Sequence, residues 1–478
     1  MILKPLATAA VLSFAAASAD AATCFVDPTG TSGIAGAYAS TQAALAGTCN
    51  TPGSVIELWC PAGGCADGSV SISGLSDITI RSQELAGSSG PVGFSASAAG
   101  PAVHVSKSFN IRFEGFDHYY SNSWAVAVED SDVFFEGPGS LPSPRYSDVH
   151  GARGMRVDGA SHVQLSWVGF SHNRVGLAMQ SNLNGSPFVT GEGLAFVGNE
   201  LAADLVGGDP LCSTVGDGPS LTIGGDYGVS WLNYVMGNTA GFQLRGSADL
   251  RMDHTLLANN LNRALSMGGN PHLISLNDAS SFEGRNLLVY DNDSHGGLTG
   301  PYAGGVNTAG VILNHSSCGK AALVASTIIN NATDLVFNIE SASSGDLALD
   351  HVVTHGNWGK LLSMSSWYTS HGSACPPLVM NDTASWGDRV IADPATCTPP
   401  TLTTTWDPVP TVAFFTPRTV RGYPNLNRPR RNLYLINRRQ PSFTGAGPAG
   451  LFHSRPWSVD GVNNDADARL DMGYHNPW

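Results

Sequence analysis

The sequence predicts an all-β fold, a right-handed parallel β-helix in which three short strands form each coil of a solenoid. Three observations predict this fold. An asparagine recurs after short apolar segments, the composition is rich in glycine and poor in charge, and a helix-like run near the N-terminus is suited to cap the first coil. Together they indicate one elongated repeat domain rather than several compact domains.

The asparagine repeat consists of an apolar segment, then Asn, then in most cases a second apolar strand. The intervals between successive asparagines are 26, 39, 22, 32, 39 and 26 residues. The shorter intervals fit one coil, and the longer ones fit a coil with a loop insertion. Asn tolerates the left-handed backbone that a tight bend needs, and its amide both donates and accepts, so we expect stacked asparagines to form a ladder. The asparagines are Asn173, Asn199, Asn238, Asn260, Asn292, Asn331 and Asn357.

The composition supports many short strands. The chain has 56 Gly and 28 Pro, and only 13% of its residues are charged. Long surface helices need runs of Lys, Glu and Ala, which are scarce here, whereas Gly, Ser and Asn suit strands joined by turns. The formal net charge of -14 at pH 7 opposes a general affinity for nucleic acid.

The first residues have the features of an export signal. Lys4 supplies a positive charge, residues 6–17 are apolar but too short to span a bilayer, and Ala19-Asp20-Ala21 is a small-x-small cleavage sequence. We expect residues 1–22 to be a signal peptide and the mature chain to be secreted or displayed at the cell surface. No later segment is apolar for long enough to form a membrane span.

The eight cysteines are an even number in a chain expected to be exported, and they therefore predict disulfides. Spacing favours three local pairs and leaves two cysteines to pair across coils or to stay free. The local pairs are Cys24 with Cys49, Cys60 with Cys65, and Cys375 with Cys397, and the remaining two are Cys212 and Cys318.

Both ends of the solenoid must be capped because they expose strand edges. Residues 40–46 form the helix-like run, and residues 52–58 follow as a turn and strand. This arrangement resembles the opening of bacterial right-handed β-helix repeat proteins of the pectate-lyase-like superfamily. The sequence Asp471-Met-Gly-Tyr-His475 resembles the aspartate-rich tail that closes many exported bacterial β-helix proteins.

The resemblance implies a cap and first strand over residues 23–60, a parallel β-helix over 61–400, and an Arg-rich segment with a capping tail over 401–478. It also implies export to the periplasm or outer surface of a bacterium. It does not identify a substrate, because the superfamily contains polysaccharide lyases, glycoside hydrolases, pectin esterases and adhesins. The best-known catalytic motifs of these enzymes are not evident.

The strands that precede the asparagines can be aligned with one another by counting back from each asparagine. This alignment predicts a charged outward face. Seven residues before two successive ladder asparagines lie Asp253 and Arg285, and two residues earlier on the same outward face lie Arg251 and Glu283. We expect these four on adjacent coils about 4.8 Å apart. The resemblance makes this face the candidate catalytic site of a lyase or hydrolase. The alternative is a pair of cross-strand ion pairs with no function. His254 is predicted to be an edge residue near the turn.

The tail contains a candidate calcium site. Asn463, Asp465, Asp467 and Asp471 have the spacing that opens a calcium-binding loop, although Ala468 stands where such a loop has glycine. The alternative is an Asp-rich turn with solvated carboxylates. Calcium is the only cofactor that the sequence suggests.

Three functions are compatible with these features. The first is a secreted or cell-surface β-helix that binds extracellular polysaccharide or glycan, or has an adhesive or structural role. The second is a polysaccharide lyase or glycoside hydrolase acting on an extracellular polymer such as a polyuronate. The third is a subunit of an extracellular assembly, contacted through the Arg-rich segment or tail. Aromatic residues such as Tyr119, Tyr120 and Trp124 are candidates for stacking on sugars, or for packing under loops.

Overall fold

The structure is a computed structural model. It describes residues 21–83 apart from 62, 91–138 apart from 98, 146–208, 218–224, 233–260 apart from 259, 273–292 apart from 291, and short segments between 310 and 474. Several predictions concern residues outside this part of the chain. They are residues 1–20 of the signal peptide, Asn357, most of the Arg-rich segment, the cysteines Cys212, Cys318, Cys375 and Cys397, and the calcium candidates Asn463, Asp465, Asp467 and Asp471.

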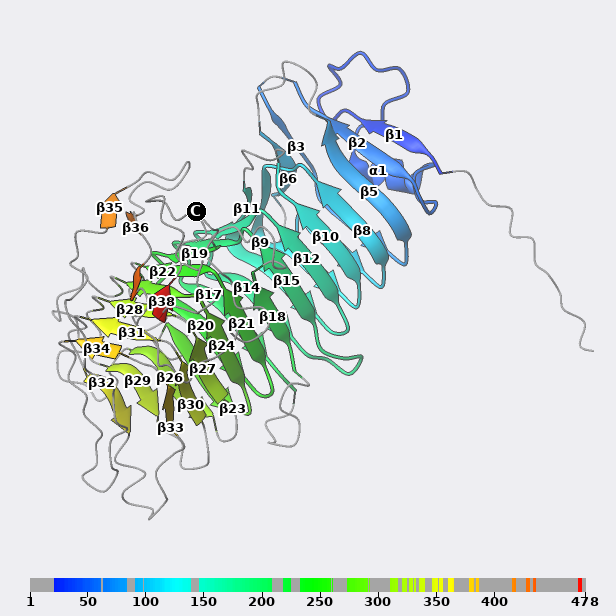
Figure 1. The fold of residues 1–478 in the computed structure, drawn as a ribbon. Helices are drawn as coiled ribbons and strands as arrows, with labels where there is room; N and C mark the ends of the chain where they lie inside the picture. The colour runs from blue at the N-terminus through cyan, green and yellow to red at the C-terminus, as the bar shows by residue number, and fades with distance from the viewer. Residues whose placement is uncertain are drawn as a thin grey trace, which may run out of the picture.

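The chain forms a right-handed parallel β-helix, which confirms the predicted fold class (Figure 1). One side of each coil contributes a strand to a 13-stranded sheet, here called sheet A, in which every described pairing is parallel. Its strands, in order, are β1 (Thr23–Val26), β2 (Val55–Trp59), β5 (Ser76–Gln83), β8 (Phe109–Glu114), β10 (Asp132–Glu136), β12 (His162–Ser166), β15 (Phe188–Glu192), β18 (Ser220–Ile223), β21 (Asp249–Asp253), β24 (Ser281–Arg285), β27 (Lys320–Val324), β30 (Asp346–Asp350) and β33 (Leu378–Asn381).

The other two sides of each coil form two further parallel rows, B1 and B2. Row B1 contains β3 (Cys65–Asp67), β6 (Val92–Ala96), β13 (Val168–Ser171), β16 (Ala195–Val197), β19 (Asn233–Met236), β22 (Thr255–Ala258), β25 (Leu288–Tyr290), β28 (Thr327–Ile329), β31 (Val353–His355) and β34 (Ala384–Trp386). Row B2 contains β4 (Val70–Ser73), β7 (Val103–Ser106), β14 (Val175–Gln180), β17 (Leu201–Val206), β20 (Ala240–Arg245), β23 (Ile274–Asp278), β26 (Gly310–Ser316), β29 (Leu335–Ile339) and β32 (Lys360–Met364). The long strands β9 (His118–Glu129) and β11 (Ser147–Asp158) run through both rows.

The core lies inside the coils, because alternate residues of each strand point inward. In β21, for example, Leu250 and Met252 are buried and Arg251 between them is exposed. Aromatic rings fill the early coils, where Phe113 and Phe135 stack with centroids 5.0 Å apart. Tyr119 is fully buried in this cluster, so it belongs to the core and is not available to sugars. Burial of each such ring contributes about 2–3 kcal/mol.

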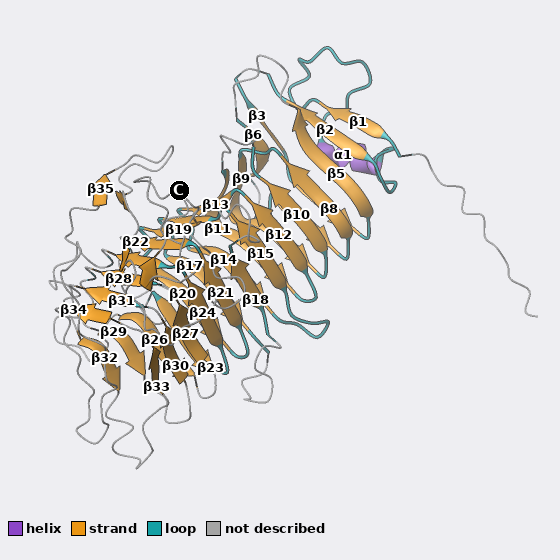
Figure 2. Ribbon diagram, in the orientation of Figure 1, coloured by secondary structure: helices purple, strands orange, loops and turns teal. Residues whose placement is uncertain are grey.

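A short helix, α1 (Thr41–Ala46), lies at the N-terminal end of the solenoid, as predicted (Figure 2). It begins after Ser40, whose hydroxyl accepts a hydrogen bond from the Ala43 backbone N–H at 3.1 Å. Leu45 is buried on the face that meets the first coils. The first backbone N–H of the helix donates to the Asp67 carboxylate, so the cap is tied to β3.

Two predicted disulfides are present, Cys24–Cys49 and Cys60–Cys65. The first closes a segment with a sequence separation of 25 and joins β1 to the residues just after α1. Cross-links of this kind stabilise mainly by restricting the unfolded chain.

The asparagine ladder is also present, and it joins six coils between Asn173 and Asn331. The amide Nδ2 of each asparagine donates to Oδ1 of the next at 2.8–3.0 Å. The same Oδ1 accepts the backbone N–H of the preceding asparagine, and each Nδ2 also donates to a backbone carbonyl of the previous coil. The six side chains are buried. Interior ladder amides are therefore fully satisfied.

The predicted left-handed conformation of these asparagines is wrong. The residue before the asparagine takes it instead: His172 has φ 54°, Gly198 has φ 65° and Gly237 has φ 64°. The bend is made one residue early, which leaves each asparagine free to turn its amide inward. The ladder begins at Asn173 because β11 on the preceding coil runs through the bend without an asparagine, and Oδ1 of Asn173 has no partner in the described residues.

The C-terminal segment includes two short antiparallel strand pairs. Strand β35 (Phe415–Pro417) pairs antiparallel with β36 (Asn427–Pro429), and β37 (Leu433–Leu435) pairs antiparallel with β38 (Met472–Tyr474). The Met-Gly-Tyr motif of the predicted tail is therefore a strand paired to the Arg-rich segment. Among the described residues, the model contains no helix that is long and apolar enough to span a membrane.

We expect Asn238→Ala to lower the free energy of unfolding by about 3 kcal/mol, because it leaves the buried backbone and amide N–H groups of Asn199 without acceptors. Chemical denaturation followed by circular dichroism measures the change. The matched control is Asn122→Ala, since Asn122 is exposed, and it should stay within about 0.5 kcal/mol of wild type. Equal effects of the two substitutions would contradict a structural role for the ladder.

Candidate functional site

The outward side chains of sheet A stand in columns that run along the solenoid axis, because the strands pair in register. Two columns are important for the site. The middle column contains Phe134, Gln164, Thr190, Thr222, Arg251 and Glu283. The edge column, two residues further along each strand, contains Glu136, Ser166, Glu192, Gly224, Asp253 and Arg285.

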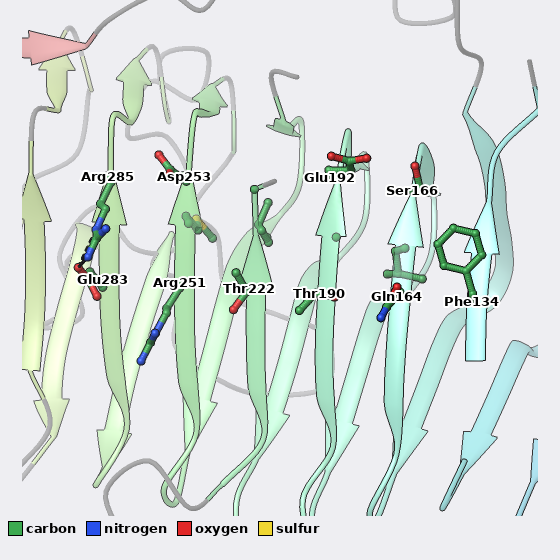
Figure 3. A pocket seen from close by; sticks show the side chains of 15 residues that line it. Phe134, Gln164, Ser166, Thr190, Glu192, Thr222, Arg251, Asp253, Glu283 and Arg285 are labelled. Atoms are coloured by element: carbon green, nitrogen blue, oxygen red, sulfur yellow. Dashed lines mark hydrogen bonds and ion pairs between the residues drawn. The ribbon is translucent and has the colours of Figure 1, made fainter. Parts of the chain in front are cut away.

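A groove of about 670 Å³ follows these columns from β10 to β24 (Figure 3). Its lining includes the whole middle column and the edge column from Ser166 to Arg285. Successive strands of a sheet lie about 4.8 Å apart, so the groove extends over about 24 Å. Phe134 lies at one end, and the charged side chains of β21 and β24 lie at the other.

The four predicted site residues lie together at this charged end. Arg251 is the register partner of Glu283, and Asp253 is the register partner of Arg285. The predicted strand register is therefore confirmed, and all four residues line the groove. Their catalytic role stays a prediction.

The predicted cross-strand ion pairs are replaced by pairs within one strand. Arg251 Nε lies 3.1 Å from a carboxylate oxygen of Asp249, and Arg285 NH2 lies 2.6 Å from Glu283 Oε1. Residues i and i+2 share one face of a strand, and a long arginine side chain leans along the strand and reaches its neighbour. Both guanidinium groups therefore already have a carboxylate partner.

Asp253 is paired differently. Its Oδ1 lies 3.0 Å from Nδ1 of His254, and the exposed side-chain fractions are 20% for Asp253 and 2% for His254. The prediction that His254 is an edge residue near the turn agrees with its place directly after β21, and its imidazole is buried. The residue has a left-handed backbone with φ 45° at the turn from sheet A to row B1.

Gly224 makes room for Asp253 on the neighbouring coil. A Cβ atom at this glycine would lie 2.8 Å from the Asp253 Cβ, and its φ of +132° disfavours other residues. No side chain therefore stands between Glu192 on β15 and Asp253 on β21. Within the described residues, the Glu192 carboxylate makes no ion pair.

Glu192 and Gly224 were not predicted as site residues. Counting back seven residues from Asn199 does reach Glu192, so the signal that identified Asp253 was present on this coil too. The same count from Asn238 reaches Trp231 and misses Gly224, because the coil between them contains an insertion. No motif or spacing in the sequence identified the polar residues Gln164, Thr190 and Thr222 of the middle column.

Carboxylates dominate the edge column beyond the groove. Glu136 is the register partner of Glu114. Burial, together with the negative charges of Glu114 and Glu192, raises the pKa of Glu136 above its usual value, and Arg112 offsets this only in part. Like charges directly opposite on neighbouring strands are destabilising, and a raised pKa reflects that repulsion.

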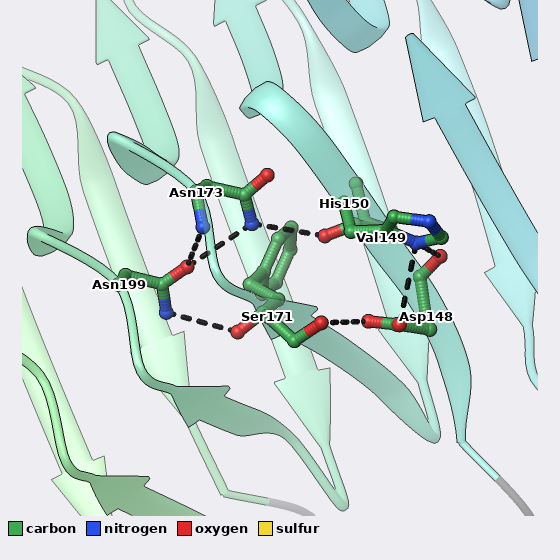
Figure 4. Close-up of polar contacts among 7 residues, drawn as sticks. Asp148, Val149, His150, Ser171, Asn173 and Asn199 are labelled. Atoms are coloured by element: carbon green, nitrogen blue, oxygen red, sulfur yellow. Dashed lines mark hydrogen bonds and ion pairs between the residues drawn. The ribbon is translucent and has the colours of Figure 1, made fainter.

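A second polar cluster lies on row B1, beside the start of the asparagine ladder (Figure 4). Ser171 Oγ donates to Asp148 Oδ1 at 2.6 Å, and His150 Nδ1 lies 3.2 Å from Asp148 Oδ2. Hydrogen bonding to Asp148 raises the pKa of His150, whereas burial and His150 lower the pKa of His118. The serine hydroxyl donates to a carboxylate rather than to a histidine, so this cluster differs from the arrangement in which a histidine activates a serine.

Within the described ranges, no three His, Cys, Asp or Glu side chains are arranged to hold a metal ion. The predicted calcium ligands Asn463, Asp465, Asp467 and Asp471 lie outside those ranges, and calcium binding there stays a prediction.

Comparisons with known proteins give one structural match to report. No family model matches the chain, and no curated protein matches it. The solved structure titled "Crystal structure of pectate lyase Pel9A" is 14% identical, covers 82% of this chain and 82% of that chain, and has a TM-score of 0.34. At these values, the similarity carries no argument about activity.

We expect Glu136→Gln to stabilise the protein at neutral pH and to have little effect near pH 4. The folded protein raises the pKa of Glu136 above its usual value. The wild type therefore loses stability as the pH rises above that usual pKa and the carboxyl ionises. The glutamine variant has no carboxyl at this position and does not lose this stability. Thermal melts at several pH values measure the difference. Glu200→Gln is the control, since Glu200 lies 3.9 Å from Arg174 and its loss removes an attraction. A gain that is equal at all pH values would contradict the electrostatic cause.

Proposed function

We propose that this protein is an exported β-helix that binds an extended polysaccharide along the groove of sheet A. The observation that carries the proposal is the groove itself, which crosses six strands without interruption from Phe134 to Arg285. A channel about 24 Å long suits a polymer better than a compact small molecule. The two disulfides of the cap region support export to an oxidising compartment.

Aromatic rings in and beside the groove support a sugar ligand. Phe134 lines one end of the groove and is half-buried, and the Arg112 guanidinium lies 4.4 Å from its ring centroid. Phe188, in the adjacent column and outside the groove lining, is 43% exposed and stacks on His162 at 5.4 Å. Exposed aromatic rings are costly to hydrate, and they pair well with the apolar faces of sugar rings. The middle column between the two ends offers amide and hydroxyl groups for sugar hydroxyls.

The charges favour a neutral polysaccharide over a polyuronate. The groove lining contains three carboxylates, Glu192, Asp253 and Glu283, and two guanidinium groups, Arg251 and Arg285. Each guanidinium is already paired with a carboxylate on its own strand. A polyanion would thus meet excess negative charge and would need bridging cations to bind.

We expect Phe134→Ala to weaken polysaccharide binding by roughly threefold to tenfold, the loss of one stacking contact. The probes are neutral hexasaccharides of glucose, mannose and xylose with β-1,4 links, and polygalacturonate with and without calcium, measured by calorimetry. Phe109→Ala is the matched control, because Phe109 is 62% exposed and lies outside the groove. If the wild type binds none of these probes at millimolar concentration, the proposal fails. Tight binding of polygalacturonate alone would overturn the preference for neutral polymers.

Hydrolysis of the bound glycan is a second candidate function, and the pair Glu192 and Asp253 favours it. The two residues are two strands apart, which places their Cα atoms about 9.6 Å from each other. Inverting glycoside hydrolases separate their two carboxyl groups, and not the Cα atoms, by about 6.5–9.5 Å so that a water fits beside the sugar, and the two side chains would have to lean toward each other to reach that range. Gly224 keeps the intervening coil clear. A lyase is less well supported, since neither arginine is available to stabilise an enolate.

If the protein hydrolyses one of the neutral probes, Glu192→Gln and Asp253→Asn should each lower kcat by about a hundredfold or more. Reducing-end release measures kcat, and NMR of the first product anomer should show inversion. Glu136→Gln is the matched control, since it makes the same change in the edge column beyond the groove lining. Unsaturated product absorbing in the ultraviolet would point to a lyase, and full activity of both groove variants would exclude this pair.

A further inference from the structure

We infer that His254 is a positioning residue for Asp253, and that its buried imidazole holds the Asp253 carboxylate in the orientation that faces the groove. This inference rests on the proposed function for its consequence, which is glycan affinity. The contact itself rests on geometry alone.

The contact is close and shielded from water. Nδ1 of His254 lies 3.0 Å from Oδ1 of Asp253, and only 2% of the histidine side chain is exposed. Both atoms are buried, and neither makes a hydrogen bond within the described residues, so the contact is an ion-pair contact and not a hydrogen bond. A buried carboxylate oxygen without a hydrogen bond depends on the polar group that faces it, and here the imidazole faces it. The rest of the Asp253 side chain faces the groove.

The turn does not require a histidine. Equivalent turns follow the edge-column residue on other described coils, and three of them have left-handed backbones: Trp167 has φ 57°, Gly193 has φ 60° and Asn286 has φ 49°. Residues as different as glycine, asparagine and tryptophan therefore occupy this position. The left-handed backbone alone does not select a histidine at position 254.

Backbone contacts fix the turn from several sides. The backbone N–H of His254 donates to the Arg285 carbonyl at 3.2 Å, and its carbonyl accepts the Asn233 N–H at 3.1 Å. The Asp253 carbonyl accepts from Thr255 Oγ1 at 2.9 Å and from Asn233 Nδ2 at 3.2 Å. The backbone of both residues is therefore held independently of the imidazole. The contact of the imidazole at 3.0 Å is what concerns the Asp253 side chain.

Two substitutions separate this role from turn formation. Asparagine at position 254 keeps an amide donor near the Nδ1 position, whereas glycine keeps only the backbone conformation. We expect His254→Gly to weaken binding of the neutral hexasaccharides on the order of fivefold, because the buried carboxylate oxygen loses the polar group that faces it, and His254→Asn to retain most of the affinity. Thermal melts of both variants establish that they are folded.

Matched controls come from His172, which also has a left-handed backbone, with φ 54°, but is exposed and lies at the bend between rows B1 and B2. His172→Gly and His172→Asn should leave affinity unchanged. Equal affinity of His254→Gly and His254→Asn would overturn the inference, because turn conformation would then explain the residue.

A second measurement does not depend on any glycan. Nitrogen-15 NMR of the wild type should show a slowly exchanging proton on Nδ1 of His254, and Asp253→Ala should abolish its protection or shift its resonance. If Nδ1 bears no proton, or if its resonance is the same in Asp253→Ala, the inference is wrong even when the glycan binds. If no glycan binds but the NMR result holds, the proposed function fails and the positioning contact stands.

Discussion

The buried ladder of asparagine amides is the interaction on which the rest of the structure depends. Each interior amide makes hydrogen bonds to the coils on both sides, and all six described side chains are buried. A slip of one residue between coils would leave several buried polar groups unpaired, at a cost of about 1–3 kcal/mol for each. The ladder therefore fixes the register of every coil it joins. That register places the outward side chains of sheet A in straight columns, and a groove along the axis follows.

Much of the fold was predictable because the ladder is visible in the sequence as an asparagine that recurs after short apolar segments. The asparagines gave the coil boundaries, and counting back from them placed Asp253 beside Arg285 correctly. The same count failed near Gly224, where the coil between Glu192 and Asn238 is lengthened by an insertion. The left-handed residue was placed one position too late, because sequence preference shows that a bend exists but not which of two neighbouring residues makes it.

The ion pairs were harder to predict than the register. Sequence alignment shows which residues are neighbours across strands, but an arginine also reaches two residues along its own strand. Arg112 with Glu114 and Arg251 with Asp249 are same-strand pairs, whereas Arg81 pairs with Glu57 across strands. The outcome depends on side-chain rotamers, which the alternating pattern does not specify. Such partly exposed pairs contribute little to stability. Under the proposed function they matter because each arginine of the groove already has a carboxylate partner, which disfavours a uronate ligand.

The turns that follow the edge column repeat from coil to coil in the described part of the chain. At Trp167, Gly193, His254 and Asn286 the backbone is left-handed, and at position 254 only 2% of the side chain is exposed. Where the edge-column residue is Arg285, the turn residue is Asn286, and where it is Glu192, the turn residue is Gly193. Only on the Asp253 coil, among the turns described, does a histidine occupy the position with its ring nitrogen at 3.0 Å from the carboxylate. A regular solenoid thus gives one carboxylate of the groove a buried polar partner, whereas Glu192, two coils away, has no ion pair in the described part of the chain. If the proposed hydrolysis occurs, these unlike surroundings would push the pKa values of the two carboxyls apart, which is the condition for one to act as acid and the other as base.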